Sequence, residues 1–171
     1  MRTWIDLSQI DTPDRIAAMK KDVRGYPIPF SVKYGADGAP DFRVIDPEKW
    51  EDAVIAKRCG ICGGFLGSHL AFVGGPRSIE NRYFTDLPMH RDCAIYALRV
   101  CPFIAAPKFS YSKDFTEEIA VNEHVSTTRP SRFGLGISKG FEVVRLPQGD
   151  IALRSQPFKS IEWWENGFKI G

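Results

Sequence analysis

Helical and strand-like patterns of apolar and polar residues alternate along the first part of the chain. Residues 12–14 (TPD) are typical of a helix start and predict a helix over about residues 13–23. Residues 25–29 (GYPIP) end that helix, because proline fixes the backbone and lacks an amide proton. Residues 30–34 and 42–45 then alternate apolar and polar side chains around a turn that contains glycine, which predicts a β-hairpin.

A second helix is predicted over residues 47–57, because Asp46 can cap it and a proline follows at its first position. This helix is expected to carry Trp50, Val54 and Ile55 on one face.

The last part of the chain has a weaker pattern. Residues 107–130 are polar and predict a loop or a short irregular helix. Residues 141–146 and 151–154 flank a turn with the sequence PQGD and predict a second β-hairpin. Residues 160–167 (SIEWWENG) predict a short helix that begins at a serine cap and stops at Asn-Gly. Of its two adjacent tryptophans, one is expected to pack inward and the other to cover a rim.

Composition and charge narrow the class of protein. The chain has 171 residues, of which 43% are hydrophobic and 26% charged, so it can bury a core. Because no stretch of about 18 apolar residues occurs and the first residues lack an apolar leader, we expect a cytoplasmic protein without a membrane partner. The formal net charge of +2 argues against general coating of a polyanion, although it leaves room for a local basic face.

Candidate chemistry is concentrated in one pattern, C-x2-C-x27-H-x2-C, formed by Cys59, Cys62, His90 and Cys93. Two cysteines spaced by two residues can bind one ion when the backbone makes a tight knuckle, and the glycines that follow Cys62 permit the positive φ of such a turn. His90 and Cys93 precede a strong helical run, so they are predicted on one face of the first turn of a helix.

Residues 65–75, between the two ligand pairs, look like strand and turn. A knuckle, a hairpin and a helix that donates two ligands make up the treble-clef arrangement of zinc proteins. Because three thiolates and one imidazole complete a tetrahedron, the predicted Zn²⁺ site is structural.

The sequence therefore predicts an α+β fold with a treble-clef zinc-binding core, flanking β-hairpins and short helices. Residues 1–107 are expected to form the zinc-binding domain, with its N-terminal helix and hairpin. Residues 108–171 are expected to add a hairpin and a helix to the same domain.

Other interpretations of the cysteines remain open at this point. Four unrelated buried thiols and a redox C-x-x-C pair are the main alternatives, and a disulfide framework is disfavoured because nothing marks the chain as secreted. Cys101 could replace His90 as the fourth ligand, although its place near the far end of the predicted helix favours a core role.

The chain resembles a family of small proteins of bacteria and their phages that have no assigned biochemical function. The resemblance is carried by residues 24–29 (RGYPIP), 40–47 (PDFRVIDP), 59–67 (CGICGGFLG), 90–94 (HRDCA) and 99–103 (RVCPF), and more loosely by 162–167 (EWWENG). It implies that the cysteine pattern is a shared zinc-binding feature, and it implies no reaction.

The chain is also similar, more weakly, to HNH endonucleases, which are built on treble clefs. His69 precedes a Gly-Gly pair and is followed by residues 78–81 (SIEN). The likeness implies His69 as the general base that activates water, Asn81 as the residue that orients it, and Mg²⁺ as the ion that stabilises charge on the phosphate. Ser68 stands where the HNH pattern has aspartate.

Three functions follow from these patterns. The first is a non-enzymatic, zinc-stabilised interaction module, phage-encoded, that binds a host or phage protein, with an anti-defence role among its uses. Its surface is expected to include Trp4, Trp50 and Trp163, since aromatic side chains anchor protein interfaces. The second is nucleic-acid binding through a local basic cluster made of Arg77, Arg82, Arg91 and Arg99. The third is the HNH-like nuclease. The sequence names neither the partner nor the oligomeric state.

Overall fold

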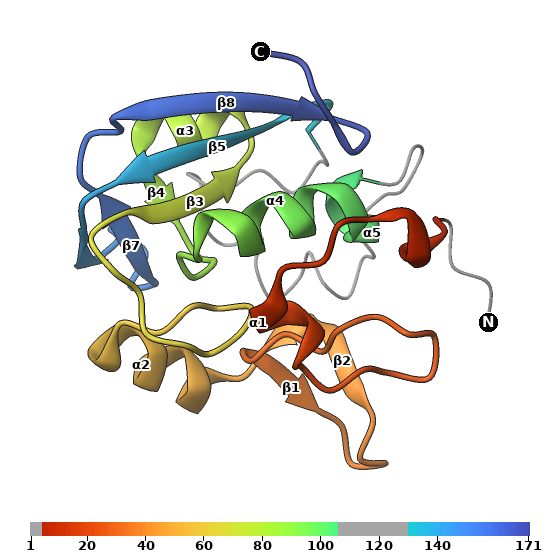
Figure 1. Cartoon of the computed structure of the whole chain (residues 1–171). Coiled ribbons are helices and arrows are strands. Elements are labelled where there is room, and N and C mark those ends of the chain that lie inside the picture. Colours follow the sequence, from red (N-terminus) through yellow and green to blue (C-terminus); the bar gives the residue numbers. More distant parts are fainter. Residues whose placement is uncertain (1–4, 106–129) are drawn as a thin grey trace.

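The computed structural model describes residues 5–105 and 130–171, which form a mixture of helices and antiparallel strands (Figure 1). The largest sheet has the strand order β3-β5-β8-β9 and consists of β3 (Leu70–Gly74), β5 (Phe133–Ser138), β8 (Ser160–Glu165) and β9 (Phe168–Lys169). A three-stranded sheet, in the order β4-β7-β6, consists of β4 (Tyr83–Phe84), β7 (Ile151–Ser155) and β6 (Phe141–Arg145). Strands β1 (Val32–Tyr34) and β2 (Pro40–Ile45) pair separately.

The helices are short apart from two of ten residues each. They are the 3-10 helix η1 (Leu7–Gln9) and the α-helices α1 (Asp14–Ala17), α2 (Pro47–Ala56), α3 (Pro76–Asn81), α4 (Arg91–Val100) and α5 (Pro102–Ala105). None of the helices in the described ranges combines the length and the hydropathy needed to cross a lipid bilayer.

Strand β3 separates two apolar clusters because successive side chains of a strand point to opposite faces. Ala71 and Val73 pack in one cluster with the buried face of α4, and Leu70 and Phe72 pack in the other with Ile79 of α3. The two helices therefore cover opposite faces of the sheet, as Figure 1 shows.

Elements with strong local signals are confirmed. The two predicted hairpins form as β1–β2 and β6–β7, and the helices predicted from residues 47 and 90 form as α2 and α4. Asp46 caps α2, since its carboxylate accepts the amide protons of Glu48 and Lys49. One detail is wrong: Trp50 and Val54 face the core, but Ile55 is 75% exposed.

The helix predicted over residues 13–23 is wrong in length, because α1 ends at Ala17. The carboxylate of Asp22 accepts the amide protons of Arg24 and Tyr26 at 2.9 and 3.0 Å. An aspartate that bonds to its neighbours' amides in this way competes with helix formation, so the chain turns here.

The helix predicted over residues 160–167 is also wrong. Residues 160–165 form β8, which pairs along its length with β5. Asn166 and Gly167 have φ of 48° and 86°, so the Asn-Gly pair makes the tight turn of a hairpin into β9 and does not end a helix. The alternation of a strand places Trp164 in the core and leaves Trp163 half-buried, as expected for one inward tryptophan and one at a rim.

Strand β5 was not expected from the sequence, since its glycines obscure the apolar pattern. Both glycines are required by packing: an added Cβ would lie 2.5 Å from Ile79 at Gly134 and 2.5 Å from the Phe158 ring at Gly136. The strand that follows the knuckle, β3, takes β5 as its main partner and contacts the segment before α4 through a single bridge between Ala71 and Met89. The prediction for residues 107–130 falls outside the described residues, except at Pro130.

We predict that Gly136→Ala destabilises the fold by about 1–3 kcal/mol, because the new methyl group overlaps the Phe158 ring in a packed cluster. The free energy of unfolding from denaturant titration measures this effect. Gly67→Ala is the matched control, since a Cβ at Gly67 meets nothing within 4 Å, and it should change stability by less than about 0.5 kcal/mol. Equal stability of the two variants would show that β5 does not pack as described.

Candidate metal centre

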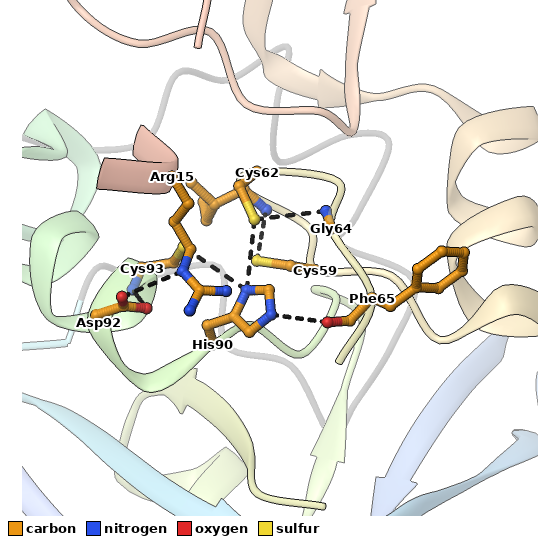
Figure 2. Close-up of polar contacts among 9 residues, drawn as sticks. Arg15, Cys59, Cys62, Gly64, Phe65, His90, Asp92 and Cys93 are labelled. Atoms are coloured by element: carbon orange, nitrogen blue, oxygen red, sulfur yellow. Dashed lines mark hydrogen bonds and ion pairs between the residues drawn. The ribbon is translucent and has the colours of Figure 1, made fainter. Parts of the chain in front are cut away.

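Four side chains predicted as metal ligands converge on one point. The Sγ atoms of Cys59, Cys62 and Cys93 and a ring nitrogen of His90 all lie within 4.8 Å of one another (Figure 2). Within the described part of the chain, no other group of three or more Cys, His, Asp or Glu side chains meets in this way. Cys101 is not a member, because it ends α4 at the opposite terminus from His90.

The first two ligands lie on a tight knuckle. The amide of Gly63 donates to the carbonyl of Cys59, and the amide of Cys59 donates to the carbonyl of Gly64, at 2.9 and 2.8 Å. Two amides also point at sulfur: Ile61 at Cys59 and Gly64 at Cys62, both at 3.4 Å. Such N–H···S contacts stabilise thiolates, which are the form that binds metal.

Gly63 is the glycine that the knuckle requires. Its φ is +74°, and a Cβ there would lie 2.9 Å from the Phe30 ring. Gly64, which the sequence also suggested for this purpose, does not use a positive φ.

The other two ligands lie at the start of α4. His90 is the residue before the first turn and Cys93 lies in that turn, so the positive end of the helix dipole faces the cluster. The Nε2 atom of His90 lies 2.9 Å from the carbonyl oxygen of Phe65. Because a carbonyl can only accept, Nε2 carries the proton and Nδ1 keeps its lone pair for the cluster.

The spacing of the donor atoms suits a tetrahedral ion. Nδ1 of His90 is 3.4 Å from Cys62 Sγ and 3.9 Å from Cys93 Sγ. With Zn–S of about 2.3 Å and Zn–N of about 2.0 Å, a tetrahedron separates sulfur from nitrogen by roughly 3.5 Å. The residues therefore fit a tetrahedral metal ion with three sulfur donors and one nitrogen donor.

Without a cation, the three thiols differ in how readily they lose a proton, as the pKa values show. A hydrogen bond from Cys93, together with backbone amides, outweighs burial and lowers the pKa of Cys59 to about 5. The same hydrogen bond, burial and the neighbouring thiolates raise the pKa of Cys93. Burial raises the pKa of Cys62. A cation would remove this competition because it can hold all three sulfurs as thiolates.

The side chain of Arg15 lies beside the cluster (Figure 2). Nε of Arg15 in α1 lies 3.2 Å from the carboxylate of Asp92, whose other oxygen accepts the Cys93 amide proton. Burial lowers the pKa of Arg15, but Asp92, Cys93 and a hydrogen bond with Cys62 outweigh that effect and raise it. Three thiolates and a divalent ion carry a net charge of −1, which the guanidinium offsets.

The residues of the HNH-like prediction lie apart from this cluster. His69 is exposed just before β3, and its ring contacts the hydroxyl of Ser68. Asn81 ends α3, where its side-chain oxygen accepts the amide proton of Tyr83.

Three of the four arginines proposed for nucleic acid have partners within the protein. Arg82 donates to the carbonyl of Ser155, Arg91 pairs with Glu162 at 2.6 Å, and the Arg99 guanidinium lies 5.8 Å from the centre of the Trp164 ring. Arg77 is exposed at the start of α3.

Two of the three tryptophans proposed for an interface contact other residues of the protein. Trp50 is half-buried and its ring nitrogen donates to the carbonyl of Thr85, and the Arg132 guanidinium lies 4.2 Å from the centre of the Trp163 ring. Trp4 lies outside the described residues.

Sequence reasoning predicted the four residues that converge here and missed the groups around them. Arg15 lies in α1 and Asp92 in the first turn of α4, and no local sequence pattern connects the two. The contact from Phe65 uses its backbone carbonyl, which every residue has, so the sequence gives no sign of it. The one available signal was Asp92 itself, an acidic residue in the first turn of a helix that begins with two ligands.

Comparisons with protein-family models, with curated proteins and with solved structures found no match for this chain.

We predict that Arg15→Ala weakens the binding of Zn²⁺ added as a probe about tenfold, because the anionic centre loses a positive charge that interacts with Cys62 and Cys93. Competition with a chromophoric chelator measures the affinity and the release rate. Arg43→Ala is the matched control. Arg43 also pairs with an aspartate, Asp41 at 3.0 Å, but both residues lie in β2 and neither belongs to the cluster. Equal zinc affinity of the wild type and Arg15→Ala would mean that the guanidinium does not support the centre.

Proposed function

We propose that this chain is a protein-binding module whose fold is held by one structural Zn²⁺ bound to Cys59, Cys62, His90 and Cys93. The observation that carries the proposal is the complete donor set: three sulfurs and one nitrogen already converge, with spacings that suit zinc.

Zinc is favoured over other metals by the donor chemistry. Thiolate and imidazole donors in a tetrahedral arrangement are typical of zinc, and iron would be better served by four sulfurs. We assign the knuckle and the start of α4 to a treble-clef-like arrangement, in which each element supplies two ligands and the Ala71–Met89 bridge holds the intervening strand against the helix.

The donor set supports a structural role for the metal. Four protein ligands fill a tetrahedral ion and leave no position for water or substrate. The remaining nitrogen of His90 is used by the Phe65 carbonyl, so the imidazole is fixed in orientation. The metal would therefore stabilise a surface and take no part in a reaction.

The surface best placed to use this rigidity surrounds Phe65. Its ring is 68% exposed, although its carbonyl is held by His90 and its backbone pairs with Arg58. The Arg58 guanidinium lies 4.5 Å from the centre of the ring and donates to the carbonyl of Gly63 in the knuckle. An exposed aromatic ring beside an arginine is a usual anchor of protein interfaces. The Arg58 side chain is 33% exposed and is held in place by an ion pair with Asp52 at 3.5 Å.

The partner expected for this surface is a host or phage protein that offers an apolar pocket for Phe65 with carboxylates at its rim for Arg58.

Metal content tests the first half of the proposal. The purified chain should carry one zinc per molecule, and Cys93→Ser should lose both the metal and most of its stability, since structural zinc contributes on the order of 10 kcal/mol in small sites. Elemental analysis and thermal unfolding measure the two effects. Cys101→Ser is the matched control and should keep its zinc, because Cys101 lies outside the cluster. Absence of zinc after purification without chelators would refute the proposal.

A native pull-down tests the second half. A protein captured from the host should bind Phe65→Ala at least about tenfold more weakly, whereas zinc content and melting temperature should stay unchanged. Phe168→Ala is the matched control, because Phe168 is 75% exposed but lies on β9. Capture that is insensitive to Phe65→Ala would exclude this surface, and salt-sensitive recovery of DNA or RNA would favour nucleic-acid binding instead.

A further inference from the structure

A large cavity lies beside the knuckle, although none of the four residues of the Cys/His cluster lines it. It has a volume of about 650 Å³ and lies between the segment around β1 and β2 on one side and β3 and α4 on the other. Sites for small molecules in proteins are concave, mostly apolar and about 300–1,000 Å³ in volume. The cavity therefore has the size of a ligand site, and the chemistry of its wall decides which ligand it suits.

The buried part of the wall is apolar. It includes Val73, Leu87, Met89, Val100 and Phe133, each of which is at most 7% exposed. A hydrocarbon gains from contact with these side chains, whereas an ion placed among them loses its hydration.

Two charged side chains lie in the described part of the wall, and their charges have opposite signs. Asp86, in the loop between β4 and α4, and Arg77, at the start of α3, are both exposed. Because each stays in contact with solvent, water screens its charge, and together they add no net charge to the wall. Neither a cation nor an anion finds a buried counter-charge here, so the wall favours a neutral ligand.

One buried polar group in the wall has no partner. Tyr26 is only 3% exposed, and its hydroxyl has no hydrogen-bond partner in the described structure. The residue is held in place, since its amide donates to Asp22 at 3.0 Å and the Arg24 guanidinium lies 4.8 Å from the centre of its ring. The hydroxyl therefore keeps its buried position and its unmet need for a hydrogen bond.

The surroundings of this hydroxyl belong to the cavity. Burial raises the pKa of Tyr26, and Cys101 and Tyr96 lie near enough to the hydroxyl to add to that shift. Both of these residues line the cavity as well. A ligand in the cavity can thus reach the hydroxyl. A carbonyl oxygen suits it best, because a carbonyl accepts the phenolic proton and brings no further donor into a mainly apolar wall.

We propose that this cavity binds a neutral, mainly apolar molecule with a carbonyl oxygen, which accepts a hydrogen bond from the Tyr26 hydroxyl while its hydrocarbon body packs between β2 and α4. Ketones, esters and amides belong to this class of ligand. This inference does not depend on the metal or on the surface around Phe65.

Four molecules with one phenylalkyl skeleton test the proposal: 4-phenylbutan-2-one carries the carbonyl, butylbenzene lacks it, 4-phenylbutan-2-amine is a cation and 3-phenylpropanoate is an anion. Titrations of the purified full chain, followed by protein NMR, should show the ketone binding at least about tenfold more tightly than either ion, because the ions lose hydration without gaining a counter-charge. Shifted resonances should include Leu87 and Val100, which line the cavity.

A substitution assigns the hydrogen bond to one hydroxyl. Tyr26→Phe should weaken binding of the ketone about tenfold and leave binding of butylbenzene unchanged, because only the ketone loses a partner. Tyr34→Phe is the matched control and should keep all four affinities, since Tyr34 is 40% exposed in β1 and does not line the cavity. Thermal unfolding without ligand should show Tyr26→Phe to be at least as stable as the wild type, because it removes an unpaired buried hydroxyl.

Four results would overturn the proposal. They are binding of either ion as tightly as the ketone, an unchanged ketone affinity in Tyr26→Phe, a Tyr26→Phe variant that is less stable than the wild type, and an absence of shifts at the cavity with millimolar ketone.

Discussion

The convergence of three sulfurs and one imidazole is the constraint on which the fold depends. It joins a glycine-rich knuckle to the first turn of α4, two segments separated by the whole of β3, α3 and β4. Cys59 and Cys93 are completely buried, yet one is driven toward the thiolate and the other toward the thiol when no cation is present. Such a cluster is costly as a set of free thiols and favourable as a set of ligands, because a divalent ion satisfies every sulfur at once.

The same centre organises its neighbours. Through His90 it holds the Phe65 carbonyl, and through Asp92 it holds Arg15 of the N-terminal helix. The backbone of Phe65 and helix α1 are therefore both held by contacts to the cluster residues or to Asp92 between them. A surface that is rigid before a partner arrives loses less conformational entropy on binding, which is why we assign the metal to the support of an interface.

The convergence of the four candidate ligands could be predicted from the sequence, because each pair is local and its spacing has a direct geometric meaning. The same holds for the two hairpins and for α2, whose turn and capping residues lie within the elements themselves. The outer contacts could not be predicted. Arg15 and Asp92 are 77 residues apart, and their pairing depends on where the fold places α1.

The errors in the fold have a common cause, since each concerns a segment whose structure is decided by distant partners or by one local bond. Residues 160–165 have acceptable helix signals, but pairing with β5 makes them a strand. Strand β5 itself is obscured by glycines that are needed for Ile79 and Phe158 to pack against it. The carboxylate of Asp22, bonded to two backbone amides, turns the chain where a longer helix was expected.

X-ray absorption spectroscopy at the zinc edge tests the central claim most directly, because it reports the atoms bound to the metal. The purified chain should show three sulfur neighbours at about 2.3 Å and one nitrogen at about 2.0 Å, with no oxygen. A bound oxygen would mean an open, reactive site, and a shell of four sulfurs would remove His90 from the centre. A chain without zinc, with its cysteines unable to take up the metal, would contradict the account altogether.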